Sequence, residues 1–328
     1  MVHLELLHHF EHDFSKAMGL KQPGVSRMLE MALQEAFAAP FFMDELLAFS
    51  AAHRSTLTDR TPGQRNLYRT EATRLQTRAL ARYSAVVAHE EKPLAVFLFS
   101  AFLGQHVLFD TFSLHSTHSG TSHSHNLAAF LDQLVHCLSL HRGIAVVAGR
   151  SWPTLIAELR TRLGPDAELF NPDTSVGAVP GTECADLMAR LAVGENGGLS
   201  ELSPASREAC REAVAALQRA FDVQRSAERG GTQVLGSRRF IGVQEWLVRV
   251  SGDYINLIAR RQPEALVILA YYSVMLHYVR NYWIVGNVGA VLGRSICSHL
   301  GGYWVDWLEW PNRMLENPGP ADGQGTLD

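Results

Sequence analysis

The sequence predicts an all-α protein folded as a large single-domain helical bundle. Long segments carry apolar residues at three- and four-residue spacing, which is the pattern of helices that bury one face. β-Branched residues in alternating runs, the usual sign of strands, are nearly absent. A chain of 328 residues with 47% hydrophobic content can bury a large core. Because apolar helical segments continue on both sides of every predicted loop, we expect one domain over residues 1–316.

The expected helices follow one another along the chain. The segments with the clearest helical periodicity are Glu71–Val87, Ala128–Val147, Ser206–Gln224, Arg239–Arg260 and Glu264–Trp283. In the third of these, apolar residues recur at i, i+4 and i+8 between Ala213 and Phe221, as in an ordinary amphipathic helix. Prolines predict where helices begin, because the missing amide hydrogen costs little there. Pro93 and Pro263 each precede an apolar helix, and Ser203-Pro204 starts the helix that follows it.

Segments rich in Gly, Pro, Ser and Asn separate these helices. Residues 113–126 form a His-rich segment that we expect to be a flexible loop. Residues 164–181 form a second long connection with several prolines and glycines, and Gly230-Gly231 predicts a further turn. Residues 317–328 have the composition of a disordered tail.

The charge balance disfavours direct binding of nucleic acid by this chain. The formal net charge is −4, whereas a nucleic-acid-binding domain usually carries a basic stripe. The start, MVHLELLHHFEHDF, lacks the charged-then-apolar layout of a secretory signal. The longest largely apolar stretch, Ala265–Leu276, is shorter than the roughly 20 residues that span a bilayer. We therefore expect an intracellular protein, cytoplasmic or nuclear, without a membrane span.

The patterns of cysteine and histidine do not favour a metal site. The cysteines are scattered singly, without a CxxC pair, at Cys137, Cys184, Cys210 and Cys297. The His-rich loop carries imidazoles that suit a transition metal, but a flexible loop has no second shell to orient them. These histidines are His115, His118, His123 and His125. Residues His8–His12 formally match the HxxEH pattern of some metalloproteases, but they lie close to the chain start. No nucleotide-binding or nucleophile motif is present, so no cofactor is expected.

Two aromatic stripes at helical spacing predict either a packed core or an apolar cavity. The residues of the first are Tyr271, Tyr272, Met275 and Tyr278, with Tyr282 and Trp283 in the turn that follows. The residues of the second are Phe99, Phe102 and His106, at i, i+3 and i+7. Such a stripe is more often core, simply because a large helical domain needs one. Apolar walls with a few polar groups are also the usual design of a site for a hydrophobic small molecule.

Polar groups within these stripes need partners. Adjacent residues on a helix do not face the same way, so Tyr271 and Tyr272 point in different directions. If they are buried, at least one phenol needs a hydrogen-bond partner, and so does the imidazole of His106 or of His277.

Blocks of sequence along the chain resemble one known family. The run Pro263–Leu315 begins with PEALVILAYY, passes through the turn WIVG and ends in WLEWP. This run closely resembles the C-terminal end of the helical regulatory domain of fungal zinc-cluster transcription factors, in the subgroup of sterol uptake control regulators. Further blocks that resemble this family, in the same order, are Leu4–Phe14, Ala39–Ser55, Phe97–Ser100 and Leu140–Leu155. The resemblance implies the same large helical regulatory domain.

The resemblance does not include the DNA-binding module of the family. Those regulators bind DNA through an N-terminal module in which six closely spaced cysteines hold two zinc ions. This chain has no such cluster, and Met1 stands almost directly before the helical domain. We therefore expect either a truncated form or a stand-alone protein that has kept the regulatory fold and lost the DNA reader.

The resemblance implies a sterol receptor with its ligand buried near the PEALVILA helix and the glycine turn. Carried over to this chain, the implied ligand-binding residues are Leu269, Tyr272, Met275, Leu276, Trp283 and Gly286. The second stripe adds Phe99 and Phe102. Asn287 stands where the family usually has Trp, and Val285 where a charged residue is common. These departures leave open another lipid, a terpenoid or a polyketide as the ligand.

Two further functions stay open. One is a stand-alone enzyme of fungal specialised metabolism that uses the same pocket for cofactor-independent cyclisation or cycloaddition, because orientation in a preformed cavity accelerates such reactions. Its candidate catalytic residues are His106, Tyr271, Tyr272 and His277. The other is an interaction module that dimerises with a full-length regulator and weakens its action, through Trp304, Trp307 and Trp310. We favour ligand binding, because the resemblance supports it directly whereas catalysis needs an additional assumption.

Overall fold

The computed structural model describes most of the chain, and every regular element in the described residues is a helix. These residues are 2–14, 23–57, 59–86, 93–117, 123–164, 167, 180–193, 202–229 and 235–316. Buried apolar side chains from Leu6 near one end to Leu308 near the other form one hydrophobic cluster. The prediction of an all-α, single-domain bundle is therefore confirmed. The predicted tail, residues 317–328, lies outside the described residues.

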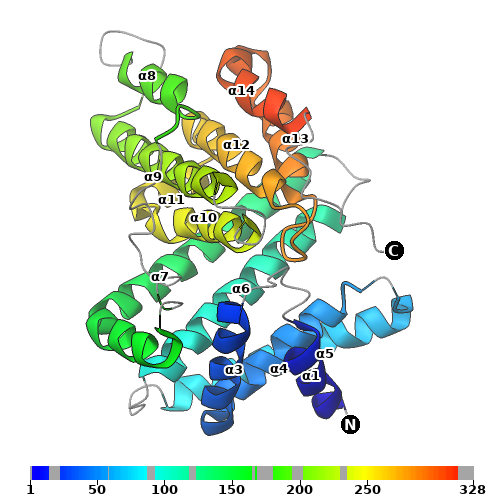
Figure 1. Cartoon of the computed structure of the whole chain (residues 1–328). Helices are drawn as coiled ribbons and strands as arrows, with labels where there is room; N and C mark the ends of the chain where they lie inside the picture. The colour runs from blue at the N-terminus through cyan, green and yellow to red at the C-terminus, as the bar shows by residue number, and fades with distance from the viewer. Residues whose placement is uncertain are drawn as a thin grey trace.

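The N-terminal helices pack against one another in the lower part of Figure 1. They are α1 (Val2–His12), α3 (Pro23–Ala38), α4 (Pro40–Arg54) and α5 (Pro62–Val86). Helix α4 contacts each of the other three and forms the centre of this part. Almost every residue from Phe41 to Arg54 is buried, as expected for a helix that is covered on all sides.

The C-terminal helices form the upper part of Figure 1. They are α8 (Ala185–Val193), α9 (Pro204–Arg229), α10 (Leu235–Arg249), α11 (Gly252–Ala259), α12 (Pro263–Tyr278), α13 (Val288–Leu300), the 3-10 helix η3 (Gly302–Trp304) and α14 (Val305–Glu316). Helix α12 is the centre of this part, because every residue from Glu264 to His277 is buried. It contacts α9, α10, α11, α13 and α14.

Two long helices connect the lower and upper parts. Helices α6 (Pro93–Thr117) and α7 (His123–Leu163) pack against each other and cross the middle of Figure 1. Helix α6 contacts α4 and α13, and α7 contacts α3, α10, α11 and α13. The two parts therefore share a core through these helices.

Helix α6 also corrects one expectation from the sequence. Among the described residues, the segment Pro93–Ser113 of this helix is long and apolar enough to cross a membrane. The expectation that Ala265–Leu276 is the longest apolar stretch is therefore wrong. In the fold, 61% of the most apolar 18 residues of the segment Pro93–Ser113 are buried inside the protein, as in the core helix of a bundle. A few polar residues within the segment hid its length from a search for unbroken apolar runs.

The helix starts follow simple local rules. Proline occupies the first position of α3, α4, α5, α6, α9 and α12. The starts predicted at Pro93, Ser203-Pro204 and Pro263 are confirmed. At the start of α5, Thr61 Oγ1 accepts the amide hydrogen of Gln64 at 3.3 Å, while Gln64 Oε1 accepts that of Thr61 at 3.0 Å. This reciprocal pair is a capping box.

Two of the predicted helices are interrupted or shortened in the structure. The segment Arg239–Arg260 is interrupted at Ser251, whose Oγ accepts the amide hydrogen of Tyr254 at 3.3 Å and caps a new helix. The predicted helix Glu264–Trp283 ends at Tyr278. The residues after it form a turn that reverses the chain, so the aromatic residues at the end of the apolar run belong to the turn.

Two glycines allow α13 to pack on α12. Gly286 has a φ of 52°, in the left-handed region that favours glycine. At Gly289, a Cβ atom would lie 2.5 Å from both the carbonyl oxygen of Ser273 and the amide nitrogen of His277. The backbones of the two helices therefore approach so closely that only glycine fits.

Helix occupies the ends of the predicted loops. Helix α6 runs through Thr117 and α7 begins at His123, so helical backbone covers both ends of the segment 113–126. Residues 118–122, which include His118, and the side chains of the other loop histidines lie outside the described residues. Helix α7 ends at Leu163, one residue before the predicted connection 164–181, of which residues 165–166 and 168–179 also lie outside.

Candidate functional site

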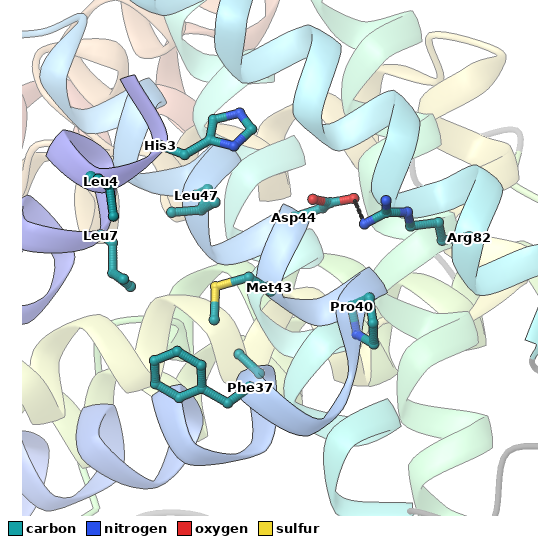
Figure 2. A pocket seen from close by; sticks show the side chains of 10 residues that line it. His3, Leu4, Leu7, Phe37, Pro40, Met43, Asp44, Leu47 and Arg82 are labelled. Carbon is teal, nitrogen blue, oxygen red and sulfur yellow. Dashed lines mark hydrogen bonds and ion pairs between the residues drawn. The ribbon is translucent and has the colours of Figure 1, made fainter. Parts of the chain in front are cut away.

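An open cleft of about 330 Å³ lies between α1, α3 and α4, with one side chain from α5 (Figure 2). Its lining residues are His3, Leu4, Leu7, Ala36, Phe37, Pro40, Met43, Asp44, Leu47 and Arg82. Most of them are apolar, and Figure 2 shows Asp44 and Arg82 together on the side opposite the leucines of α1. The volume falls at the lower end of the roughly 300–1,000 Å³ that small-molecule sites occupy.

Helical spacing builds the apolar wall of this cleft. Leu4 and Leu7 are one turn apart on α1, and Met43 and Leu47 are one turn apart on α4, so each pair lies on one face of its helix. Leu4 is 73% exposed and Phe37 is 67% exposed at the rim of the cleft. Large exposed apolar side chains beside an apolar hollow indicate a binding surface. This spacing was readable in the sequence, but it did not distinguish these residues from core residues.

A buried carboxylate with two arginines forms the polar end of the cleft. Asp44 accepts hydrogen bonds at both oxygens from Arg78, at 2.8 Å from Nε and 2.6 Å from Nη2. Arg82 Nη1 donates a further hydrogen bond to Asp44 at 2.8 Å. Two guanidinium groups thus face one carboxylate, which leaves one surplus positive charge. The side chain of Asp44 is only 4% exposed, whereas that of Arg82 is 48% exposed.

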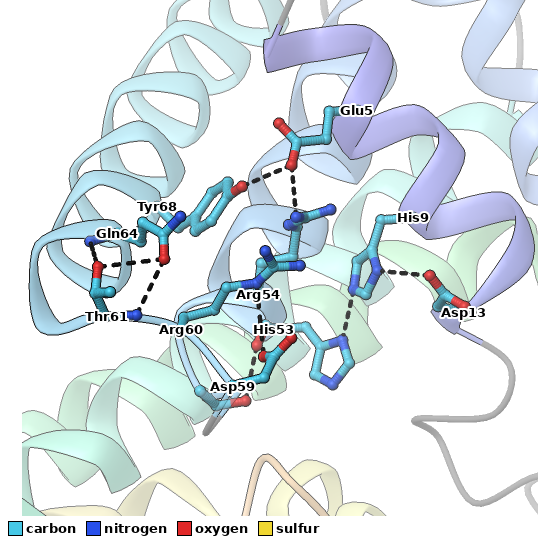
Figure 3. Close-up of polar contacts among 11 residues, drawn as sticks. Glu5, His9, Asp13, His53, Arg54, Asp59, Arg60, Thr61, Gln64 and Tyr68 are labelled. Atoms are coloured by element: carbon cyan, nitrogen blue, oxygen red, sulfur yellow. Dashed lines mark hydrogen bonds and ion pairs between the residues drawn. The ribbon is translucent and has the colours of Figure 1, made fainter.

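A polar cluster next to the cleft holds α1 against α4 and α5 (Figure 3). Glu5 accepts hydrogen bonds from Arg54 Nη2 at 2.5 Å and from the hydroxyl of Tyr68 at 2.8 Å. The guanidinium of Arg54 also lies over the ring of Tyr68, 4.8 Å from its centroid. Burial and the hydrogen bond to Glu5 raise the pKa of Tyr68. Because Leu4 and Leu7 flank Glu5 on α1, this cluster positions the α1 wall of the cleft.

Two buried histidines join α1 to α4 one turn further along (Figure 3). His9 Nε2 lies 2.8 Å from His53 Nδ1, and His9 Nδ1 lies 3.3 Å from a carboxylate oxygen of Asp13. Burial is the main cause that lowers the pKa of both, and the neighbouring charge of His9 further lowers the pKa of His53, to about 4. Both rings are therefore neutral at pH 7, with one nitrogen of the pair donating and the other accepting. The ring of His53 also contacts Trp283, with 4.9 Å between centroids.

The structure brings three of the predicted site residues together around Phe49. Its ring centroid lies 5.8 Å from those of Phe102 and His106. It lies 5.2 Å from that of Trp283, which also contacts His53. Sequence analysis missed Phe49 as the centre of this group. Its position one turn before His53 on a largely apolar helix was the available signal.

His106 forms a buried pair with Glu45. Nδ1 of His106 lies 2.9 Å from Oε1 of Glu45, and their side chains are 1% and 0% exposed. Burial favours the uncharged imidazole, but the hydrogen bond to Glu45 and its charge outweigh burial and raise the pKa of His106. Burial also raises the pKa of Glu45. The prediction that His106 or His277 needs a polar partner is confirmed for His106, and this partner is a carboxyl group that can exchange a proton with it.

The predicted residues of α12 form a second group in the upper part of the fold. Tyr272 stacks on Trp246 with 4.2 Å between centroids and donates a hydrogen bond to the carbonyl oxygen of Val243 at 3.3 Å. Tyr271 stacks on Trp310 at 4.9 Å, so the two phenols face different helices, as predicted. Burial raises the pKa of both tyrosines. The other predicted ligand-binding residues of this helix, Leu269, Met275 and Leu276, are also fully buried.

The remaining predicted residues lie in other places. Phe99 packs edge-on to Phe41, with 5.2 Å between centroids. His277 is 9% exposed near the end of α12, and Gly286 lies in the turn after it. The residues predicted as ligand-binding or catalytic do not line the cleft between α1, α3 and α4. Their role in binding or catalysis stays a prediction.

In the part of the chain that the structure describes, side chains that could bind a metal are not grouped, and two buried cysteines stay protonated. There, no three His, Cys, Asp or Glu side chains form a group that could hold a metal ion. Within the HxxEH match His8–His12, His9 instead pairs with His53 and Asp13. Burial raises the pKa of Cys137 and of Cys210 to about 12, so both thiols stay protonated at neutral pH.

Comparison with known proteins adds one similarity. No protein-family model and no solved structure matches the chain. A segment is 35% identical over 82 residues to a Zn(2)-C6 fungal-type transcription factor from Gibberella zeae. The match covers 24% of this chain and 17% of that relative, so the chain spans less than a fifth of the relative's length in this match. This similarity supports a relationship between the chain and the fungal transcription factors.

Proposed function

We propose that this chain is a regulatory domain of the fungal transcription-factor type and that it binds a small hydrophobic molecule. The proposal rests on the presence of the cleft between α1, α3 and α4. Its apolar walls, its volume of about 330 Å³ and its few charged groups match the composition of small-molecule sites. The similarity to a fungal transcription factor supports a regulatory role in the nucleus or the cytoplasm.

The contacts of α1 suggest how a bound ligand could influence the rest of the domain. A ligand in the cleft would touch Leu4 and Leu7 on α1 together with Met43 on α4, and so would stabilise the contact between the two helices. The same two helices are joined by His9 and His53, and His53 contacts the turn after α12 through Trp283. Ligand occupancy would thereby be sensed in the C-terminal half of the domain.

The proposed ligand class includes sterol-like, terpenoid-like and polyketide-like molecules. The cleft is the favoured location, because it is open to solvent whereas Tyr272 and Met275 are 0% exposed. Binding among the α12 residues would require stacked rings such as Tyr272 and Trp246 to separate. That alternative location is tested with the variant Met275→Ala, which truncates a buried side chain of α12.

The experiment uses the purified chain, a mixed extract of fungal sterols, terpenoids and polyketides, and native mass spectrometry. We expect a retained small molecule that is recovered unchanged. Phe37→Asp places a charge at the rim of the cleft and should weaken binding at least tenfold, since burial of a Phe side chain contributes about 1.5–3 kcal/mol. Leu67→Asp is the matched control, because Leu67 is 55% exposed on α5 and does not line the cleft. Equal binding by both variants would exclude the cleft as the site.

The same experiment separates binding from catalysis. Chromatography of the released small molecules is recorded alongside the mass spectra. If an input molecule disappears and a product of equal mass but altered retention time appears, the chain is a cofactor-independent cyclase. The candidate residues would then be tested first at His106, which has a carboxyl partner in Glu45. The native mass also reports whether the chain forms a homodimer.

A further inference from the structure

We propose that the ligand of the cleft is an anionic amphiphile, namely a monocarboxylic acid with an aliphatic tail. Its carboxylate would bind Arg82, and its tail would lie along the apolar wall between α1 and α4. The inference rests on the proposed function, because it names the ligand class of the same cleft. It differs from an uncharged sterol-like ligand in requiring a positive charge at one end of the site.

The charge balance at the polar end of the cleft favours an anion. Arg78 alone satisfies both oxygens of Asp44, with hydrogen bonds of 2.8 and 2.6 Å. Arg82 adds a second positive charge through one hydrogen bond of 2.8 Å. The site therefore carries a surplus charge that a ligand carboxylate could neutralise. A hydroxyl group could accept a hydrogen bond but could not neutralise this charge.

Arg82 has the geometry to bind both Asp44 and a ligand. A guanidinium carries five N–H donors, and the bond from Arg82 to Asp44 uses one of them. The Arg82 side chain lines the cleft and is 48% exposed, whereas that of Arg78 is 34% exposed and is absent from the lining. Arg82 can therefore accept a ligand without releasing Asp44.

The charged groups at the His3 rim of the cleft are already balanced. His3 lines the cleft, and its Nε2 lies 3.3 Å from a carboxylate oxygen of Glu71. Glu71 in turn accepts hydrogen bonds from Arg74 at 2.8 and 2.6 Å. The negative charge of Glu71 is thus compensated and does not oppose an anion at Arg82.

The apolar wall provides a path for an aliphatic tail. In Figure 2, Leu7 and Phe37 lie on the other side of the cleft from the Asp44–Arg82 pair, and Met43 lies between. Phe37 is 67% exposed, so a tail laid against it would cover apolar surface that now faces water. Met43 is unbranched and adapts its shape to a flexible chain. A head group at Arg82 and a tail toward Phe37 would occupy both ends of the cleft.

The test compares dodecanoate with dodecanol, which share the same tail and differ in the head group. Binding of each is measured by isothermal titration to the wild-type chain, to Arg82→Gln and to Arg69→Gln. Arg69 is an exposed arginine on the same helix outside the cleft, so this control removes the same net charge. The fold should survive Arg82→Gln, because Arg78 still pairs with Asp44. We expect dodecanoate to bind about tenfold more tightly than dodecanol, and only Arg82→Gln to remove this difference.

Each other outcome has a distinct meaning. If both compounds bind equally to the wild type, the proposed function stands and the anionic ligand class is wrong. If neither compound binds and the fungal extract also yields no ligand, the proposed function itself fails. Co-sedimentation with phosphatidylglycerol vesicles is the last arm, since a lipid head group is also an anion. Retention on vesicles without binding of monomeric dodecanoate would overturn the proposal in favour of a membrane surface.

Discussion

His9 and His53 are hydrogen-bonded to each other through their imidazole nitrogens, at 2.8 Å between Nε2 and Nδ1. Both rings are buried, at 4% and 5% exposure, and they join the first helix of the chain to the central helix of the lower part. A second proton on this pair would place two positive charges in contact inside the fold. The contact between α1 and α4 therefore depends on at least one of the two rings staying neutral.

We predict that this pair makes the fold sensitive to mild acid. The pKa of His53 is about 4 in the folded protein and 6.5 in the unfolded chain, so the unfolded state takes up the proton first as pH falls. The contribution of uncharged His53 to the free energy of unfolding is therefore fully present above pH 6.5 and is lost between about pH 6.5 and about pH 4. His53→Gln should reduce the fall in the free energy of unfolding across this range by up to about 3 kcal/mol, measured by urea unfolding at a series of pH values.

His12 provides the control for this prediction. Its side chain is 56% exposed and stacks on His8 at the surface. His12→Gln should leave the pH dependence of the wild type unchanged. An identical slope in the wild type and in His53→Gln would contradict a role for the buried pair.

We predict that Gly289→Ala destabilises the protein by about 1–3 kcal/mol, because its Cβ would overlap backbone atoms of Ser273 and His277 at 2.5 Å. Gly143→Ala is the matched control within α7, since a Cβ there meets no atom within 4 Å. That change should stabilise the protein by up to about 1 kcal/mol through helix propensity. Thermal unfolding of both variants measures the difference. If Gly289→Ala leaves the stability unchanged, α12 and α13 are further apart in solution than in the structure.

We predict that separating Glu45 from His106 is costly. His106→Ala leaves a buried carboxyl group without its hydrogen bond and should lower the free energy of unfolding by about 3–5 kcal/mol. Glu45→Gln keeps a hydrogen-bonding side chain of the same shape and should cost only about 1 kcal/mol. Urea unfolding checks both values, with the exposed His136→Ala as the control, which should change stability by less than about 0.5 kcal/mol. If the Glu45 and His106 variants lose the same free energy of unfolding, the broken pair is not the cause of the destabilisation.

We predict that Met275→Ala affects stability but not ligand binding. Met275 is 0% exposed in the centre of α12, and its truncation leaves a cavity that should cost about 2–5 kcal/mol. If the ligand occupies the cleft, its dissociation constant should stay within about twofold of the wild type at a temperature where the variant is folded. A large change in affinity would instead place the ligand among the α12 residues implied by the family resemblance.

The helices were predictable because their signals are local. Pro93, Ser203-Pro204 and Pro263 mark helix starts through their own geometry, and the structure agrees with each of them. The break at Ser251 was missed because an N-cap competes with an otherwise continuous apolar pattern. Continuous periodicity alone does not reveal where a single side chain ends one helix and begins another.

The two aromatic stripes were recognised from the sequence, but their arrangement was not. Phe102, His106 and Trp283 share a contact with Phe49, whereas Tyr272 lies against Trp246 in another part of the fold. Residues more than a hundred positions apart meet here. Helical spacing specifies which face of a helix is apolar, but it does not specify which other helix covers that face.

The sequence by itself determined that this protein is all-α and largely a single core, because helix periodicity and caps act over a few residues. It also indicated that one of the adjacent tyrosines, and either His106 or His277, need polar partners if they are buried. Only the tertiary structure decided that Leu4, Leu7, Phe37 and Met43 border an open cleft beside Arg82. The physical reason is that a cleft is space left between helices, and its existence depends on how closely those helices pack rather than on any one of them.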